Sequence, residues 1–256
     1  MFTSLTSTPH MTKASAPTPT TWSEILEQAY GIFDNLDEKG FGTPPFSLGG
    51  GTVLMFKFKH RLSKDIDLFG YDAQWLSAIS PRLNEYTAVL ATDYSEQANS
   101  IKIVTDKGDI DFIIAADITH PVAREKAMLA GRFMEIDPIS EILAKKLYYR
   151  AAFFKARDIY DLSATIDLAP DDARAAIKAA APKKDILLRR LDELETLSGA
   201  TLKSEIIPYD GALHHGHGMI QKVKSFIKSS VPKHREIATR RQYASIVKSK
   251  DDQTER

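Results

Sequence analysis

Two aspartates separated by one residue are the side chains of this sequence best placed to do chemistry. Asp65 and Asp67 lie in the run Ser63-Lys64-Asp65-Ile66-Asp67-Leu68-Phe69, which alternates polar and apolar residues as a half-buried strand does. Residues two apart on a strand face the same side, so these carboxylates would repel each other unless a cation lies between them. A hard divalent ion with oxygen ligands, Mg²⁺ above all, fits that arrangement.

A second acidic strand is expected to extend this set. Asp106-Lys107-Gly108 predicts a tight turn into a strand over residues 109–115, where Asp111 lies between apolar residues. A charged side chain in such surroundings needs a partner, whereas Asp109 sits at the turn, where aspartate commonly forms local hydrogen bonds. Asp111 is therefore the better candidate for a third metal ligand, and Asp109 is the reserve.

Three consecutive glycines, residues 49–51, precede the Asp65 strand and are followed by Thr52. A glycine-rich turn at the start of a helix presents backbone N–H groups to phosphates. Taken singly, the glycines are most simply a loop and the alternating aspartates an exposed strand face. In this order, however, a strand, a glycine turn, a helix and two acidic strands describe a two-metal phosphoryl-transfer site.

The segments 48–54 and 61–69 resemble the first motif of the AbiEii/AbiGii-type nucleotidyltransferase toxins. This family includes the MenT-type toxins and belongs to the DNA polymerase β-like nucleotidyltransferase superfamily. Its members show a G-G-T-A-L run and an R-x-S-x-D-x-D-L-F run. The present sequence departs from them in a third glycine and in Val53, which replaces the usual alanine.

Two later segments extend the resemblance, which covers about residues 45–165. Residues 141–147 resemble the family's E-x-L-A-x-K helix, whose lysine, Lys146 by spacing, is expected to contact the nucleotide phosphates. Residues 157–162 resemble its [KR]-D-x-x-D-L helix, whose acidic residue completes the active site. Asp158 is preferred for that role and Asp161 comes second.

The helical spacing separates two neighbouring lysines. Glu141 and Lys145 stand four residues apart, which on a helix predicts a surface ion pair. Lys146 lies about 100° further round the helix and can point inward. The resemblance implies a nucleotide-binding set made of Gly50, Gly51, Thr52, Ser63, Lys146 and Asp161.

The elements that must position these residues follow from hydrophobic periodicity. Before residue 137 the pattern mixes helices (21–36, 52–59 and 72–86, the last bent or broken near Pro81) with strands (46–48, 65–69, 88–94, 101–105, 109–115 and an edge strand at 132–136). From Asp137, the expected N-cap, with Pro138 at the first helical position, the pattern is helical to about residue 152. Further helices are expected at 156–167, 170–180, 183–197, 218–230 and 232–248.

These elements predict an α/β (α+β) protein in three parts. Residues 1–20, of which twelve are Ser, Thr or Pro, are expected to be a disordered tail. Residues 21–136 would form a nucleotidyltransferase core with a mixed sheet. Residues 137–256 would form a helical region that completes the active site and binds substrate.

Composition bounds the class of protein. The 256 residues include 34 Lys or Arg and 34 Asp or Glu, so the formal net charge is zero, which argues against a protein that coats nucleic acid by bulk charge. Cysteine is absent, which excludes disulfides, cysteine-ligated metals and thiol nucleophiles. With no apolar run of about 18 residues and no signal-peptide core, a cytoplasmic protein without a membrane span is expected.

Basic residues gather near the end of the sequence. Residues 222–250 contain nine Lys or Arg and one acidic residue. Such a run is usually a solvated helical face, but beside a nucleotidyltransferase core an RNA-binding surface is slightly favoured. The expected RNA-binding residues are Lys222, Lys224, Arg240 and Arg241. The nearby His214-His215-Gly216-His217 is interpreted as a polar loop rather than a metal site.

The resemblance implies a toxin that transfers a nucleoside monophosphate from an NTP to the 3′ end of tRNA and so blocks translation. Mg²⁺, or alternatively Mn²⁺, would be held by Asp65, Asp67 and Asp111, and Asp111 or Asp158 would help to deprotonate or orient the attacking hydroxyl. A cognate antitoxin is the expected protein partner, and the toxin itself is expected to be a monomer. Two alternatives remain: the same fold could modify a small molecule or a protein side chain, or serve as a non-catalytic nucleotide-binding module.

Overall fold

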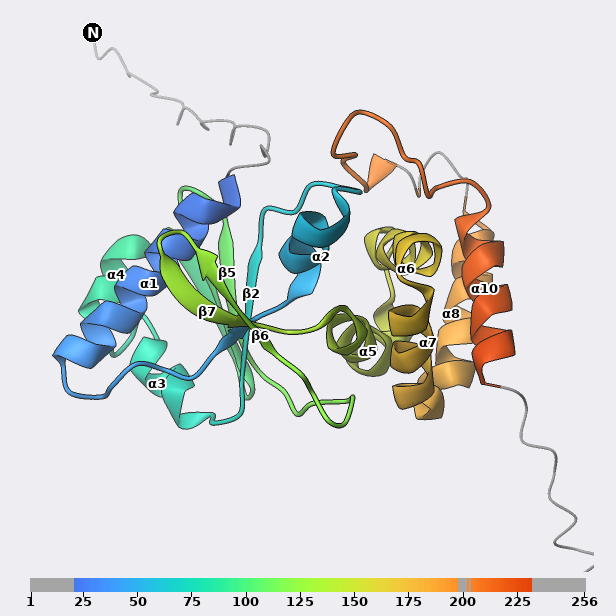
Figure 1. Ribbon diagram of the computed structural model, residues 1–256. Coiled ribbons are helices and arrows are strands. Elements are labelled where there is room, and N and C mark those ends of the chain that lie inside the picture. The colour runs from blue at the N-terminus through green and yellow to red at the C-terminus, as the bar shows by residue number, and fades with distance from the viewer. Residues whose placement is uncertain (1–20, 198–201, 203, 232–256) are drawn as a thin grey trace, which may run out of the picture.

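A seven-stranded mixed sheet forms one half of the molecule and a group of helices forms the other (Figure 1). This computed structural model describes residues 21–197, 202 and 204–231. The strand order is β3-β4-β5-β2-β1-β7-β6. The strands are β1 (Ser47–Leu48), β2 (Ile66–Gly70), β3 (Asp93–Gln97), β4 (Ser100–Val104), β5 (Asp109–Ile114), β6 (Glu125–Leu129) and β7 (Arg132–Ile136). The α/β class and the mixed sheet expected from the sequence are thereby confirmed.

The two acidic strands lie side by side at the centre of the sheet. β2 and β5 run parallel, and Asp67 is paired directly with Asp111. Ile66, Leu68 and Gly70 of β2 and Ile110 and Phe112 of β5 are buried on one face, and the aspartates are on the other, as the alternation in the sequence predicts. β1 joins β2 on its other side in the antiparallel sense and pairs with β7 in the parallel sense.

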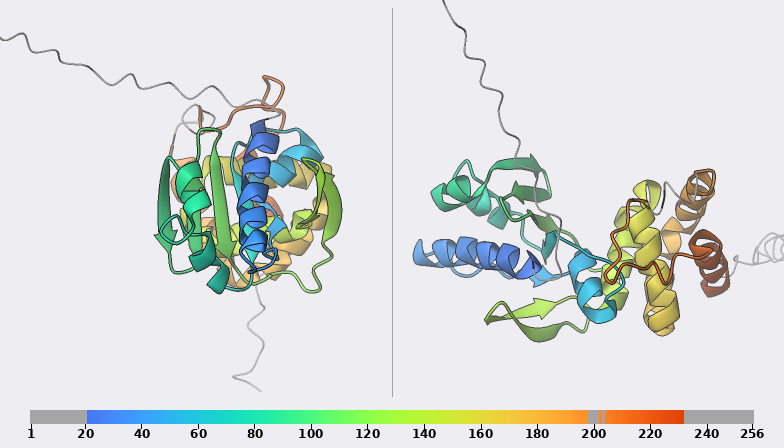
Figure 2. Two further views of the ribbon diagram at one scale, coloured as in Figure 1. Left: turned by 90° about the vertical axis from the view of Figure 1, so that its left-hand side faces the viewer. Right: turned by 90° about the horizontal axis from the view of Figure 1, so that it is seen from above.

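The buried face of the sheet is covered by α1 (Thr21–Glu38), with α3 (Gln74–Ile79) and α4 (Glu85–Leu90) beside it (Figures 1 and 2). The apolar stripe of α1 enters the core, where the Phe33 ring meets the Phe112 ring of β5 edge to face with 6.1 Å between centroids. This packing leaves the aspartate-bearing face free to receive other elements.

Helices cover part of that second face. α2 (Gly50–Phe58) lies between β2 and the helical half, which consists of α5 (Ile139–Tyr149), α6 (Ala156–Leu168), α7 (Pro170–Ala179), α8 (Lys184–Glu195) and α10 (Met219–Ser230) (Figure 1). Short 3₁₀ turns follow α5 and α7, at Ala151–Phe153 and Ala181–Lys183. None of the helices in the described part of the chain has the length and apolar character needed to cross a bilayer.

Several predicted elements are wrong. The strand expected over 88–94 begins only at Asp93, because the Asn84 side chain accepts a hydrogen bond from the Thr87 N–H and so caps α4, which runs to Leu90. Asp137 does not cap α5, which begins after Pro138 and ends at Tyr149. β7 is not an edge strand, since β6, which the sequence pattern did not indicate, pairs with its outer side.

Pro81 interrupts one of the predicted helices, and two predicted segments lie outside the described residues. The predicted helix over 72–86 is broken where Pro81 suggested, with α3 ending at Ile79. The expected tail over 1–20 and the expected helix over 232–248 lie outside the described residues. The division at residue 137 remains a prediction.

Candidate active site

Four carboxylates lie together on the open face of the sheet. Asp67 and Asp111 are neighbours on β2 and β5, Asp109 begins β5, and Asp65 directly precedes β2. The side chains of Asp65 and Asp111 are each 19% exposed. Lys102 of β4 donates hydrogen bonds to Asp111, at 2.8 Å, and to Asp109, at 3.0 Å. The face therefore concentrates negative charge beside Lys102, and Arg157 of α6 lies 3.7 Å from Asp65 on the helical side.

Burial and crowding disturb the protonation of this cluster. Burial raises the pKa of Asp111 to about 6, and the charges of Asp67 and Asp65 add to the rise, although Lys102 lowers it. The pKa of Asp65 is also raised, by burial first and then by Asp67 and Asp109. Burial lowers the pKa of Lys102, but Asp111 and Asp109 outweigh it and bring the value to about 12. An added cation would relieve the repulsion among these carboxylates.

Two observations fit a cation beside Asp65 and Asp67. Asp65 Oδ1 is buried and accepts no hydrogen bond from the described residues. A Cβ at Gly50 would overlap the Asp67 carboxylate, and Gly50 has a φ of +69°, so only glycine suits the start of α2 against this side chain. Among the described residues no three acidic or histidine side chains form a finished metal site. Asp109 and Asp111 are paired with Lys102 instead.

The glycine turn is tied closely to β2. The Gly49 N–H donates to the Asp67 carbonyl at 2.9 Å, and the Thr52 hydroxyl donates to the Asp65 carbonyl at 2.6 Å. Thr52 is fully buried, so its hydroxyl joins helix to strand. Ser63 is also buried and lies next to Gly51. A Cβ added at Gly51 would be 2.9 Å from the Ser63 hydroxyl oxygen. Of the expected nucleotide-binding residues, Gly50 is the one that lines a cavity from this turn.

A second charged cluster joins the helical half to the residues that follow α2. Lys146 Nζ lies 3.0 Å from both Asp158 and Asp161. Arg61 donates two hydrogen bonds to Asp161, at 2.6 and 2.8 Å, and His60 Nε2 lies 2.7 Å from the same carboxylate. Both aspartates are fully buried. The structure thus brings Lys146, Asp158 and Asp161 together, as the sequence motifs suggest.

The two buried aspartates differ from Asp111 in protonation. Burial acts to raise the pKa of Asp161, but Arg61 and Lys146 hold it well below its usual range. Lys146 and Arg150 likewise keep the pKa of Asp158 low against the effect of burial. Both groups therefore stay ionised, and Asp111 is the better placed of the acids to exchange a proton near neutral pH.

A cavity of about 320 Å³ connects the two clusters. Gly50 and Asp67 line it from the sheet side, and Lys145, Lys146 and Arg150 line it from α5 and the residue after it. One carboxylate, Asp67, on one wall and three cations on the other are an arrangement suited to a metal-bound phosphate chain.

Lys145 is not the surface residue that its spacing from Glu141 predicts. Its side chain is 4% exposed, and its Nζ lies 2.7 Å from Asp137 Oδ2 and 4.3 Å from the centre of the Phe69 ring. Glu141 Oε1 is 3.6 Å away, and Glu141 is fully buried. The predicted pairing of Glu141 with Lys145 is present, but its predicted surface position was wrong, because Asp137, the expected helix cap, is itself buried and draws the lysine inward.

Sequence reasoning missed three charged residues of the site: Lys102, Lys145 and Arg150. A signal existed for Lys102, because the tight turn before β5 pairs Val104 with Asp109 and therefore Lys102 with Asp111. Arg150, the residue that follows α5, contacts Asp158 at 3.2 Å, a pairing set by the crossing of α5 and α6 rather than by sequence spacing.

The expected RNA-binding residues are only partly described. Lys222 pairs with Asp167 at 2.6 Å and Lys224 with Glu195 at 2.8 Å, whereas Arg240 and Arg241 lie outside the described residues. The histidines nearby contact acidic side chains. His214 lies 2.8 Å from Asp210, and His215 lies 2.7 Å from Asp167.

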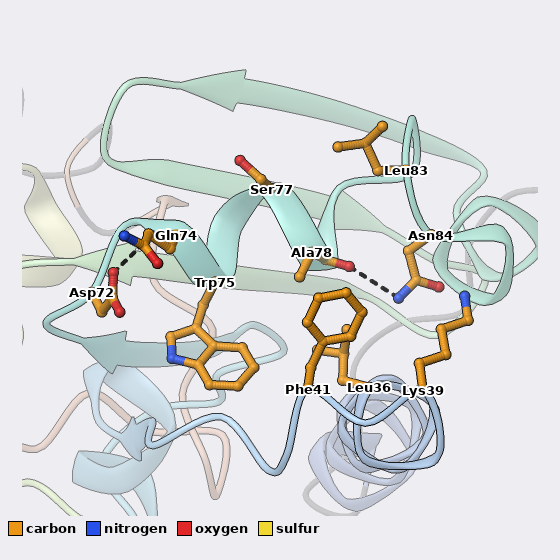
Figure 3. Close-up of a pocket in the computed structure, with 10 residues that line it drawn as sticks. All are labelled: Leu36, Lys39, Phe41, Asp72, Gln74, Trp75, Ser77, Ala78, Leu83 and Asn84. Atoms are coloured by element: carbon orange, nitrogen blue, oxygen red, sulfur yellow. Dashed lines mark hydrogen bonds between the residues drawn. The ribbon is translucent and has the colours of Figure 1, made fainter.

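A larger hollow, of about 460 Å³, lies on the opposite side of the sheet between the end of α1 and α3 (Figure 3). Phe41 and Trp75 project toward it from its two sides, and Asp72 is the one acidic residue among those that line it. It has neither grouped carboxylates nor a phosphate-binding turn, so the smaller cavity is the candidate active site.

The sequence matches the family model described as "Nucleotidyl transferase AbiEii toxin, Type IV TA system" over residues 35–207. The chain therefore belongs to this family of nucleotidyltransferase toxins of toxin–antitoxin systems. A solved structure titled "Crystal Structure of ANT(2″)-Ia in complex with adenylyl-2″-tobramycin" is similar over 65% of this chain and 98% of that chain, with 17% identity and a TM-score of 0.43. No curated protein has a significant sequence match.

Proposed function

We propose that this toxin transfers a nucleoside monophosphate from a nucleoside triphosphate to an acceptor hydroxyl, and that the acceptor is the 3′ end of tRNA. The observation that carries the proposal is the cavity in which Gly50 and Asp67 face Lys146 and Arg150. Family membership supports nucleotidyl transfer in general. The choice of tRNA rests on the resemblance to the AbiEii/AbiGii-type toxins.

We expect Mg²⁺, or alternatively Mn²⁺, to bind at Asp65 and Asp67. The unpartnered Asp65 Oδ1 and the close approach of Gly50 to Asp67 support this assignment. A bound divalent ion supplies neutralisation of the triphosphate charge. Asp111 can serve as a third ligand only after it leaves Lys102, to which it is hydrogen-bonded.

The remaining roles follow from position and charge. The acceptor oxygen forms a bond to the α-phosphorus while the bond to the β-phosphate oxygen breaks, and pyrophosphate leaves. Asp111, with its pKa near 6, accepts the proton of the acceptor hydroxyl. Lys146 and Arg150 neutralise the phosphates, and the N–H groups of Gly50 and Gly51 orient them.

A protein partner follows from the family's place in toxin–antitoxin systems. Toxins of toxin–antitoxin systems are controlled by an antitoxin, so we propose a cognate antitoxin protein for this chain.

Incubation of the protein with each α-labelled NTP, Mg²⁺ and total tRNA tests the proposal. Label should move to tRNA with the native protein, and it should be lost with Asp65→Ala or with a chelator. Asp210→Asn, which removes an exposed pair with His214, should transfer normally. Absence of transfer from every NTP, or undiminished transfer by Asp65→Ala, would contradict the proposal. Label on protein or on a small molecule instead would refute the choice of tRNA.

A further inference from the structure

The candidate active-site cavity has an apolar end that the phosphate-transfer roles leave unused. Phe69, Ile113 and Ala115 line its sheet side, and Ile142 and Tyr149 line its α5 side. Phe69 follows Asp67 by two residues on the same face of β2. Phe69 also contacts Lys145, so the apolar part of the cavity lies farther along the strands, toward Ala115 and Tyr149, where a base could lie beyond its phosphates.

Tyr149 has the properties of a stacking platform at this apolar end. It is the last residue of α5, and its hydroxyl donates a hydrogen bond to the Ala116 carbonyl at 3.1 Å. Its ring meets the ring of Tyr148 edge to face, with 5.2 Å between centroids, and 48% of the residue is exposed. A ring held at both its hydroxyl and its backbone can stack on a planar ligand at little cost in conformational entropy.

Asn99, in the turn between β3 and β4, stands at the rim of the same cavity. Its Nδ2 donates to the Ile114 carbonyl at 3.4 Å, and its own backbone carbonyl accepts from the Ile114 N–H at 2.8 Å. The side-chain oxygen is left as the group that can pair with a ligand. Asn99 is the one side-chain amide among the described residues that line the cavity.

We propose that Tyr149 and Asn99 form the nucleobase subsite: Tyr149 stacks on the base, and Asn99 Oδ1 accepts a hydrogen bond from an exocyclic amino group. Adenine, cytosine and guanine carry such a group and uracil does not, so the subsite disfavours uracil. The inference rests on the proposed function, because phosphates bound at Gly50 and Lys146 direct the base toward the apolar end.

Binding of free nucleosides, followed by saturation-transfer NMR titration, tests the subsite without metal or turnover. The native protein should bind adenosine and cytidine more tightly than uridine. Tyr149→Ala should weaken all nucleosides about ten-fold or more, whereas Tyr149→Phe, which keeps the ring, should stay within about three-fold. The native protein should prefer adenosine and cytidine over uridine about five-fold, and Asn99→Ala should abolish this preference. Phe133→Ala, which truncates an exposed aromatic away from the cavity, is the matched control.

The outcomes separate this inference from the proposed function. Equal binding of nucleosides by the native protein and Tyr149→Ala, or an undiminished preference in Asn99→Ala, would overturn the subsite. So would a native protein that binds no nucleoside. Failure of the tRNA assay alone would contradict only the transfer activity, because nucleoside binding depends on neither acceptor nor metal.

Discussion

Asp111 and Asp161 are both removed from water, yet their neighbours drive their pKa values in opposite directions. Asp161 receives two hydrogen bonds from Arg61 and a contact from Lys146, so its pKa falls despite burial. Asp111 shares the half-exposed Lys102 with Asp109 and faces two further carboxylates, so its pKa rises to about 6. One carboxylate is thereby a permanent anion, and the other is a group that exchanges protons near neutrality.

The raised pKa of Asp111 predicts a stability that falls as pH rises. Between its usual value of 3.8 and about 6 the folded state binds more protons than the unfolded state, so the free energy of unfolding decreases over this window. The loss attributable to Asp111 should be roughly 2 kcal/mol. Urea unfolding in the presence of a chelator measures the free energy of unfolding at about pH 4 and about pH 8. Its decrease from the lower to the higher pH should be smaller for Asp111→Asn than for the native protein. Equal decreases in the two proteins would argue against the assigned shift.

At the level of elements, the junction between the glycine turn and α2 decides how closely the helix approaches β2. α2 begins at Gly50, and the Asp67 carboxylate occupies the position that a side chain at Gly50 would take. Gly40, which follows α1, shares the positive φ, +82° against +69°, but a Cβ there would meet nothing within 4 Å. Substitution of Gly40 therefore tests backbone strain alone, whereas substitution of Gly50 tests backbone strain together with the contact to Asp67.

Alanine at these two glycines should give different results. Each substitution should cost about 1 kcal/mol in left-handed strain. Gly50→Ala should in addition displace Asp67 from α2 and abolish labelled-nucleotide transfer, whereas Gly40→Ala should keep it. Thermal unfolding and the transfer assay on both variants provide the measurement. Loss of transfer in both variants, or in neither, would show that transfer does not depend on the close approach of Gly50 to Asp67.

Across the whole molecule, buried charges link the sheet half to the helical half. Asp161 of α6 holds His60 and Arg61, which follow α2, and it holds Lys146 of α5. Asp137, which follows β7, holds Lys145 of α5 and receives a hydrogen bond from Ser47 of β1. Because these contacts are buried, unfolding of one half would leave buried charges of the other half without their partners. The two halves are therefore expected to unfold together.

Calorimetry of the full chain should show one cooperative transition for the described halves, with equal calorimetric and van't Hoff enthalpies. Asp161→Asn should lower the free energy of unfolding by about 3 kcal/mol, because it leaves Arg61 without its partner carboxylate. Asp210→Asn, at an exposed pair, should leave the transition unchanged. Two separate transitions in the native protein would contradict this coupling.

Local patterns account for most of the elements and part of the site. The alternation of residues 65–69 and 109–114 predicted β2 and β5 with their aspartates on one face, and the helical period predicted α6, α7 and α10 to within one or two residues. The pattern failed at α4, where a strand was expected from residue 88 but Asn84 caps a helix that runs to Leu90. It also failed at β6, a strand with little alternation in burial that depends on pairing with β7.

The sequence by itself determined the family, the strand periodicity that aligns Asp65, Asp67, Asp109 and Asp111, and the helices that carry Lys146 and Asp158. Only the tertiary structure decided that Lys145 lies buried against Asp137 and that Lys102 pairs with Asp111. It also decided that one cavity joins the charged wall to Tyr149 and Asn99. Periodicity records which face of an element turns from water, whereas a buried charge is placed by partners that the fold brings from distant parts of the chain.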